Sequence, residues 1–337
     1  MRIESWIKSE SIRIKCPAKF NLFLDLLGKR ADGYHEISTV LCPISLWDAI
    51  TIVNRHDGVI ELKLLLPQDA DPSDPAWQIP ADSSNLVVKA AERVRDALGR
   101  VEVKKGGDND RNSIGPLGCT IELRKQIPAA AGLGGGSSNA AAVVIGCMQL
   151  WSTWNRTLAD QVCQQLGSDV NFFLGSPEGF GLMLASGRGE KTKLIPHQPA
   201  LKMWFLHPPE GCSTRDVYAK VTQVGSLSKT EDFLATCQTG QESKIGAAMF
   251  NALQLPATQI NGWINKQLEL LAECGCLHRL MSGSGSSCFA ITPMEGSFEQ
   301  LKARANQIGV NRVYEVDAWY GQSIERQLTG FADESCS

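Results

Sequence analysis

The chain has 337 residues, of which 43% are hydrophobic and 20% charged, and its formal net charge is −3. These values are ordinary for a globular protein with ample core, and the length suggests two domains or one large one. A charge balance this close to neutral gives no support to a nucleic-acid or membrane partner, since such surfaces normally carry a basic patch.

The amino-terminal segment 1–8 is charged and lacks the apolar core of a signal peptide, and no apolar run approaches the ~20 residues of a membrane span. We therefore expect a cytoplasmic protein. Among the eleven cysteines, Cys274 and Cys276 form the one close pair, without a second pair or histidines at the spacing of zinc ligands. Reduced thiols, buried or half-buried, are the expectation.

In the first half of the chain, strands are predicted over 12–16, 20–27, 50–53, 59–66 and 119–124. A helix is predicted over 85–98. Two polar loops, 67–80 and 103–115, look longer than typical and are placed away from the functional motifs.

After residue 128 we expect helices over 140–150 and 158–166, turns between short strands over 175–189, and a hinge at 196–199. In the second half, strands and helices are predicted in mixed order, with strands over 201–206, 279–282, 288–292 and 312–319 and a helix over 298–308. This order is typical of an α+β architecture with helices packed on an antiparallel sheet. Residues 10–195 and 200–320 are the expected domains, and 321–337 is the expected tail.

A glycine-rich loop connects the strand over 119–124 to the following helix. Glycines let backbone N–H groups approach an anion, and a helix N-terminus adds unpaired donors and the positive end of its dipole. The spacing matches neither a Walker A loop, because serine follows Gly136, nor a dinucleotide fingerprint, because Ser137 stands at the third glycine position. Ser137, Ser138 and Asn139 either cap the helix or turn onto phosphate oxygens. A plain turn that lets the helix pack closely on the sheet is the alternative. The loop comprises Pro128, Ala129, Ala130, Ala131, Gly132, Leu133, Gly134, Gly135, Gly136, Ser137 and Ser138.

Three further segments carry candidate chemistry. Lys19 stands in an otherwise apolar strand, where a buried ammonium needs an anionic partner; a solvated charge is the alternative. Asp169 directly precedes an apolar run, where it is either a catalytic group or a helix cap. The small-residue turn 282–288 is either a hairpin connection or a second wall of a phosphate site.

Together, the segment Pro17-Ala18-Lys19, the glycine loop and the turn 282–288 resemble the three motifs of the GHMP kinase superfamily, over roughly residues 10–320. The segment 28–37, which contains Tyr34 and His35, narrows the resemblance to one branch. That branch uses ATP to phosphorylate the 2-hydroxyl of a small cytidine diphosphate compound in the non-mevalonate (methylerythritol phosphate) pathway of isoprenoid biosynthesis.

The resemblance implies an N-terminal ribosomal-protein-S5-like α/β domain over 10–195, which carries ATP binding and catalysis. It implies a C-terminal ferredoxin-like α/β domain over 200–320, with ATP and substrate meeting in the cleft between the two.

The resemblance also implies roles for single residues. Asp169 would take the proton from the substrate hydroxyl, and Lys19 would keep that carboxylate ionised and stabilise the hydroxyl as it loses its proton. Asn21 would orient the substrate. Tyr34 and Tyr218 would hold the cytosine between their rings, and His35 would hydrogen-bond its edge.

On the ATP side, Asn85 and Lys125 match positions that contact the nucleoside, and the glycine loop would wrap the phosphates. Asn85 could equally cap the following helix, and Lys125 could be a solvated charge at a strand end. Mg²⁺ is expected with ATP, near Ser138, but no carboxylate cluster marks a metal site built by the protein. The chain departs from the pattern at Asn171, where proline is usual, and around Tyr218.

Other readings within the superfamily stay open. The chain could be another small-molecule kinase, for mevalonate, homoserine or a sugar, or an ATP-dependent decarboxylase of a diphosphomevalonate. It could also be a non-catalytic ATP-binding relative, although the intact Lys19 and Asp169 argue against this. The sequence leaves the oligomeric state open.

Overall fold

The computed structural model describes residues 10–103, 116–176, 179–222, 224–225, 227–293 and 296–321. Apart from their first residues, the loop expected over 103–115 and the tail expected over 321–337 lie outside this description. Among the described helices, none is both long and apolar enough to cross a membrane. The ten cysteines in the described part of the chain all carry free thiols.

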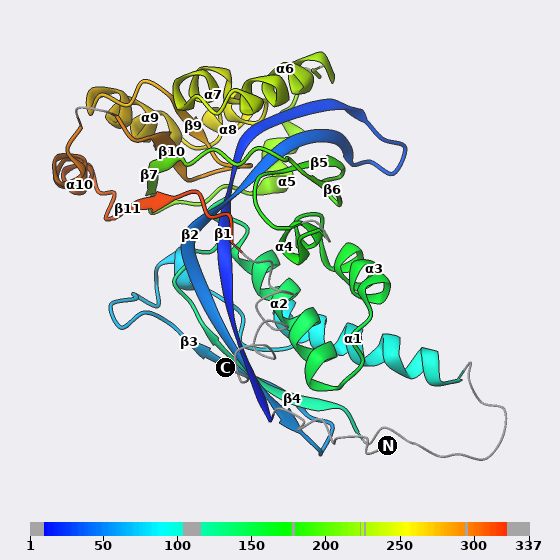
Figure 1. Cartoon of the computed structure of the whole chain (residues 1–337). Helices are drawn as coiled ribbons and strands as arrows, with labels where there is room; N and C mark the ends of the chain where they lie inside the picture. The colour runs from blue at the N-terminus through cyan, green and yellow to red at the C-terminus, as the bar shows by residue number, and fades with distance from the viewer. Residues whose placement is uncertain are drawn as a thin grey trace, which may run out of the picture.

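A long antiparallel hairpin, β1 (Ser11–Lys29) and β2 (His35–Arg55), forms the centre of the N-terminal half (Figure 1). The sheet runs in the order β3-β4-β2-β1-β8, and β5 and β6 extend it from β2. Its smaller strands are β3 (Ile60–Leu65), β4 (Gly118–Arg124), β5 (Met183–Gly187), β6 (Lys191–Leu194) and β8 (Phe250–Asn251). Because β8 pairs with β1, the second half of the chain adds an edge to this sheet.

The strands predicted over 12–16 and 20–27 are one continuous strand. Its pairing with β2 shifts register between Pro17 and Ala18 and again between Asn21 and Phe23. Such bulges re-aim side chains locally, so the two shifts set apart the short segment that carries Lys19 and Asn21.

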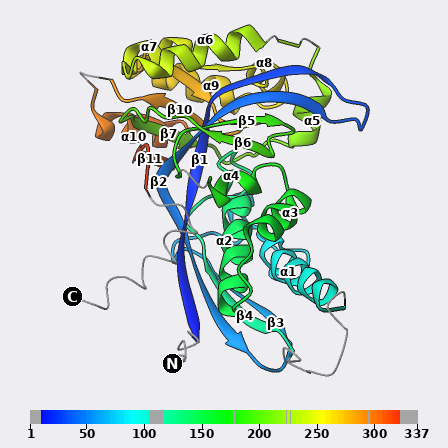
Figure 2. The ribbon, with the colours of Figure 1, turned by 45° about the vertical axis from the view of Figure 1, so that its right-hand side comes forward.

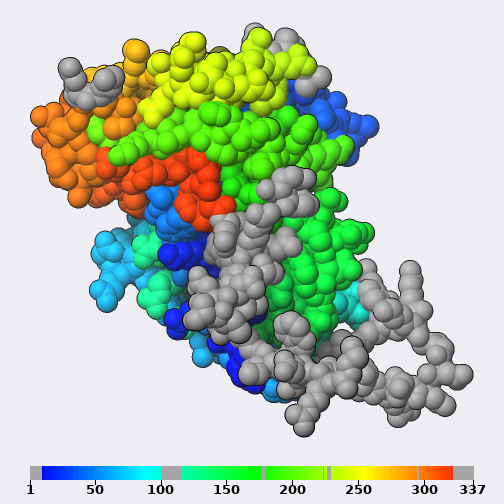
Figure 3. All heavy atoms as spheres, in the orientation of Figure 1, coloured from blue at the N-terminus to red at the C-terminus, as the bar shows by residue number. Residues whose placement is uncertain are grey.

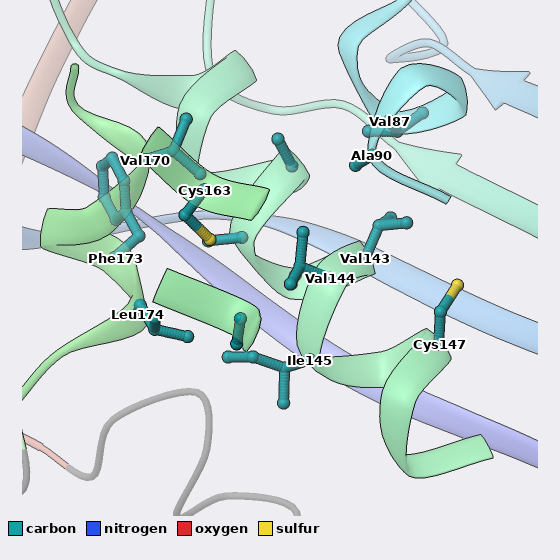
Figure 4. Close-up of a cluster of buried hydrophobic side chains, with 14 of the residues drawn as sticks. Val87, Ala90, Val143, Val144, Ile145, Cys147, Cys163, Val170, Phe173 and Leu174 are labelled. Atoms are coloured by element: carbon teal, nitrogen blue, oxygen red, sulfur yellow. The ribbon is translucent and has the colours of Figure 1, made fainter. Parts of the chain in front are cut away.

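Four helices cover one side of the N-terminal sheet, and α3 packs on the other three: α1 (Leu86–Val103), α2 (Gly135–Leu150), α3 (Arg156–Leu166) and α4 (Val170–Leu174). A short 3₁₀ helix, η1 (Pro75–Trp77), precedes them. Almost every residue of α2 is buried, because this helix lies between the sheet and the other helices. Figure 4 shows apolar side chains from all four helices gathered around it, labelled Val87, Ala90, Val143, Val144, Ile145, Cys147, Cys163, Val170, Phe173 and Leu174.

The C-terminal half forms an antiparallel sheet in the order β11-β7-β10-β9, with helices packed on it (Figure 2). This confirms the predicted α+β architecture. The strands are β7 (Lys202–His207), β9 (Arg279–Met281), β10 (Cys288–Ile291) and β11 (Arg312–Asp317); the helices are α5 (Thr214–Ala219), α6 (Leu227–Gln238), α7 (Glu242–Ala248), α8 (Gln254–Thr258), α9 (Trp263–Glu273) and α10 (Phe298–Gln307).

The two halves share an apolar contact through β1. The Phe20 ring stacks on Phe289 of β10 with centroids 4.3 Å apart, and it meets the edge of Phe205 of β7. In the space-filling view of Figure 3, the C-terminal half covers one end of the molecule, and the tip of the β1–β2 hairpin (blue) lies beside it. The bulged segment around Lys19 therefore lies where the two halves meet.

Candidate active site

An ion pair joins Lys19 of β1 to Asp169, with Lys19 Nζ 3.5 Å from Asp169 Oδ2. The Lys19 side chain is 4% exposed and the Asp169 side chain 36%, so the carboxylate faces an opening while the ammonium is buried. The alternative of a solvated lysine is therefore wrong, and the buried ammonium has the anionic partner that its burial requires.

Asp169 occupies the position immediately before α4, but its side chain makes no capping hydrogen bond. The alternative role as a helix cap is therefore wrong in this structure, and the carboxylate is left to face Lys19. The apolar run that follows forms the short helix α4, whose five residues are all buried, so the position of Asp169 is fixed by the core beneath it.

Asn21 holds the lysine in place. Lys19 Nζ donates to Asn21 Oδ1 at 2.6 Å, and Asn21 Nδ2 donates to Thr39 Oγ1 at 2.8 Å. Thr39 Oγ1 in turn donates to the Phe23 carbonyl at 2.6 Å. This buried chain of hydrogen bonds fixes the direction of the Lys19 side chain as well as that of Asn21.

The glycine loop packs directly on the Lys19 segment and on the turn 282–288. The Lys19 N–H donates to the Leu133 carbonyl at 2.9 Å, and Ser282 Oγ donates to the Gly132 carbonyl at 3.0 Å. A Cβ on Gly132, whose φ is +74°, would lie 2.2 Å from the Ser282 carbonyl oxygen. Glycine is therefore required at this position by the close approach as well as by the backbone conformation.

Helix α2 begins at Gly135, earlier than the predicted residue 140. Gly134, with φ +70°, takes the cap position, and no side chain caps the helix. Ser137, Ser138 and Asn139 are the third to fifth residues of the helix, and the capping alternative is wrong for all three. The unpaired N–H groups of this helix start consequently belong to the glycine loop itself.

Two cavities meet at the glycine loop. The larger, about 660 Å³, is lined by Lys19, Asn21 and Asp169 and by residues of both halves of the chain. The smaller, about 320 Å³, is lined by Asn85, Lys125, residues 128–137 and Asn139. Ala130, Gly132 and Gly134 line both cavities, so the ion pair lies close to their junction.

Lys125 is buried in the wall of the smaller cavity, and the solvated alternative is wrong. It forms an ion pair with Asp48 and donates to Asn139 Oδ1 at 3.2 Å. Asp48 Oδ1 also accepts from the backbone N–H groups of Gln126 and Ile127 at 2.7 and 2.9 Å. Sequence reasoning missed Asp48, because its partners lie just after β4, far along the chain.

Asn85 does cap its helix, since Asn85 Oδ1 accepts from the Val87 N–H at 3.0 Å. Its side chain nevertheless lines the smaller cavity. Ser138 lies outside both linings, and its fully buried Oγ has no hydrogen-bond partner in the structure.

The loop 67–80 lies beside the smaller cavity, so its expected placement away from the motifs is wrong. The Ala129 N–H donates to the Ala76 carbonyl at 2.9 Å, and Ile79 lines the cavity. Asn171, where the chain departs from the pattern, is the second residue of α4, and its Nδ2 donates to the Asp160 carbonyl at 3.3 Å.

Tyr34, His35 and Tyr218 all line the larger cavity. Tyr34 is 56% exposed, and the Arg188 guanidinium lies 5.1 Å from its ring centroid, whereas Tyr218 packs on His35 with ring centroids 5.3 Å apart. Burial and the nearby Asp169 carboxylate raise the pKa of Tyr218 well above its usual range, so its phenol stays protonated.

Positive side chains surround the same cavity, and sequence reasoning missed them. Lys29, Arg188 and Arg215 line it together with Lys19, and Asp169 is the single carboxylate in this lining. Burial and the charge of Lys29 lower the pKa of His35, which favours the neutral imidazole. Together these groups suit an anionic ligand that carries a ring able to stack.

The described residues contain no group of three or more histidine, cysteine, aspartate or glutamate side chains that could hold a metal ion. The hydroxyl of Ser138, near which the sequence placed Mg²⁺, has no hydrogen-bond partner, but it is fully buried and outside the linings of both cavities.

Comparison with known proteins gives this geometry a family. The family described as "GHMP kinases N terminal domain" matches residues 85–189, and the one described as "GHMP kinases C terminal" matches residues 233–311. A solved homoserine kinase from Cytophaga hutchinsonii has the same fold, with a TM-score of 0.68 at 17% identity, covering 96% of this chain and 98% of that one. The chain belongs to the GHMP kinases, which are ATP-dependent small-molecule kinases.

Longer sequence matches define the branch. A 4-diphosphocytidyl-2-C-methyl-D-erythritol kinase of Pelotomaculum thermopropionicum is 35% identical over 85% of this chain and 91% of its own length. Another such kinase, from Prochlorococcus marinus, is 33% identical over 96% of this chain and 98% of its own length. A crystal structure of a kinase of this name has a TM-score of 0.66 at 27% identity, covering 92% of this chain and all of that one. Within the GHMP kinases, the chain is a member of the 4-diphosphocytidyl-2-C-methyl-D-erythritol kinase family.

Proposed function

We propose that this kinase transfers the γ-phosphate of ATP to the 2-hydroxyl of 4-diphosphocytidyl-2-C-methyl-D-erythritol, giving the 2-phosphate and ADP in the methylerythritol phosphate pathway. The observation that carries the proposal is the Lys19–Asp169 ion pair close to the junction of two cavities that share the glycine loop. Both reactants are small and water-soluble, so we place the reaction in the cytoplasm.

ATP occupies the smaller cavity in this proposal. Its phosphates lie along the glycine loop at the start of α2, where free N–H groups and the helix dipole favour anions. The nucleoside lies towards Asn85 and Lys125, which line the same cavity. Mg²⁺ bound to the phosphates would neutralise part of the charge that develops during transfer.

The cytidine substrate occupies the larger cavity. Its diphosphate suits the positive side chains of Lys29, Arg188 and Arg215, and its pyrimidine suits the rings of Tyr34 and Tyr218. A neutral His35 can both donate and accept a hydrogen bond, which matches the mixed donors and acceptors on the edge of cytosine.

Asp169 then accepts the proton of the 2-hydroxyl as that oxygen attacks the γ-phosphorus. Lys19, held by Asn21, stabilises the oxygen as negative charge develops on it. Phosphoryl transfer depends mainly on positioning and charge stabilisation, and the two register shifts between β1 and β2 that flank Lys19 support its positioning. In this proposal residues 10–195 and 200–320 are the two domains, and each contributes a wall of the cavity.

The test is ADP release with a panel of acceptors: the cytidine substrate, mevalonate and homoserine. We expect turnover with the cytidine compound alone, and a phosphorus NMR spectrum of the product should show a new phosphomonoester beside an intact diphosphate. Turnover with mevalonate or homoserine but not with the cytidine compound would refute the assignment. ATP binding without turnover on any acceptor would point to a non-catalytic relative.

A further inference from the structure

One hydrogen bond within the loop 67–80 and two that leave it hold this loop in the wall of the smaller cavity. Asp74 Oδ1 accepts from the Ala76 N–H and caps η1. The carbonyl of Ala76 then accepts from Ala129 of the glycine loop, and the Pro80 carbonyl accepts from Asn85 Nδ2 at 2.6 Å. The conformation around Asp74 therefore decides where this wall lies.

Arg312, the first residue of β11 in the C-terminal half, forms a bidentate ion pair with Asp74. Nη1 donates to Asp74 Oδ2, and Nη2 donates to Asp74 Oδ1 at 3.0 Å. The two side chains are 16% and 23% exposed, so the pair is partly shielded from solvent. A bidentate arginine–carboxylate pair fixes the relative orientation of the two side chains, whereas an exposed pair with a single hydrogen bond does not.

The other face of the glycine loop is connected to Arg312 as well. In the β11–β7 pairing Arg312 lies opposite His207, whose Nδ1 is 3.0 Å from Ser287 Oγ. The Ser287 N–H donates to the Ala131 carbonyl at 3.4 Å. The glycine loop is therefore held by Ala76 on one side and by Ser287 on the other, and the Asp74–Arg312 pair joins the two supports.

From this arrangement we infer that Asp74 and Arg312 are positioning residues for the nucleotide: their ion pair joins the loop 67–80 to the C-terminal half and thereby sets the affinity for ATP. The inference rests on the proposed function, in which ATP occupies the smaller cavity. Neither side chain lines that cavity, so each acts through the backbone that it holds.

The test is a double-mutant cycle of Asp74→Ala, Arg312→Ala and the double variant, read as the dissociation constant of ATP by calorimetry. Each single change should weaken ATP binding about tenfold, and the double variant should be no weaker than either single one, because one contact is lost in all three. The KM for the cytidine substrate should change less than twofold. Arg312→Lys keeps the charge but cannot form the bidentate pair, so its dissociation constant for ATP should lie between those of wild type and Arg312→Ala.

Arg304→Ala is the matched control. It removes an exposed ion pair with Glu273 in the same half of the protein, away from both cavities, and should leave ATP affinity unchanged. Wild-type affinity for ATP in the folded Asp74 and Arg312 variants, whatever their melting temperatures, would overturn the inference while leaving the proposed function intact. Losses that multiply in the double variant would also overturn it. Failure of the wild-type chain to bind ATP would remove both.

Discussion

Lys19 Nζ lies 3.5 Å from Asp169 Oδ2, and the two residues reach this separation from different layers of the fold. Lys19 lies between two register shifts of a central strand, and Asp169 lies at the start of a short helix buried against that sheet. The ion pair is thus held by the core of the N-terminal half.

Replacing Lys19 by methionine keeps most of the apolar stem and removes the charge. We expect kcat to fall about 10²- to 10³-fold with little change in ATP affinity, because in the proposed function the ammonium acts on the reacting hydroxyl and not on the nucleoside. Steady-state ADP release and calorimetry with ATP measure the two effects. An unchanged kcat in a folded Lys19→Met protein would contradict this role.

Removing the ring of Tyr34 should weaken binding of the cytidine substrate. Base–aromatic stacking is worth ~1–3 kcal/mol, so Tyr34→Ala should raise the substrate KM by about 5- to 150-fold while kcat changes little. Tyr34→Phe keeps the ring and its contact with Arg188, and should lie within about twofold of wild type. If Phe proves as damaging as Ala, stacking is not the role of this residue.

Two glycines of the loop should respond in opposite directions to alanine. Gly132→Ala should destabilise the fold by about 2–3 kcal/mol, because φ is +74° and the new Cβ would meet the Ser282 carbonyl. Gly136→Ala is the control, since it lies in α2 with no atom within 4 Å of an added Cβ. It should be neutral or stabilising by up to ~1 kcal/mol. Urea unfolding of both variants measures the difference, and equal losses would contradict the packing argument.

His207 should make stability depend on pH. Burial and the charge of Arg312 lower its pKa from 6.5 to about 3 in the folded protein. Above pH 6.5 the imidazole is neutral in both states; as the pH falls, the unfolded chain takes up the proton first, so the folded state loses stability down to pH 3. Between pH 6.5 and 5 this amounts to roughly 1.5 kcal/mol. Urea unfolding of wild type and His207→Asn at pH 6.5 and 5 tests this prediction. The variant should lose less free energy of unfolding between the two pH values than wild type does, and an equal loss would exclude His207 as the cause.

The sequence was most informative where chemistry is concentrated in short segments. The glycine loop and the Lys19 strand could be recognised from local residue types, and the structure brings both together with Asp169. The strand over 11–29 was predicted in two pieces, because Pro17 and the polar side chains of Lys19 and Asn21 interrupt the apolar alternation at the bulges.

Contacts between distant parts of the chain could not be predicted in this way. Asp48 pairs with Lys125, the Arg188 guanidinium lies over the Tyr34 ring, and Arg312 pairs with Asp74. Each of these pairs joins residues that are far apart in the fold's order of elements. No local pattern encodes such pairs, because they depend on how the sheets and loops pack. The helix start at Gly135 was missed for a related reason: glycine is a poor helix former, and burial of α2 overrides that propensity.

The most direct test of the account is single-turnover phosphoryl transfer by Asp169→Asn, with ATP and 4-diphosphocytidyl-2-C-methyl-D-erythritol both saturating. The change is nearly isosteric and removes no capping hydrogen bond, so the fold and ATP binding should be preserved. We predict that the transfer rate falls about 10²- to 10⁴-fold, the usual contribution of a general base. A rate within a few-fold of wild type would show that the proton leaves by another route and would contradict Asp169 as the base.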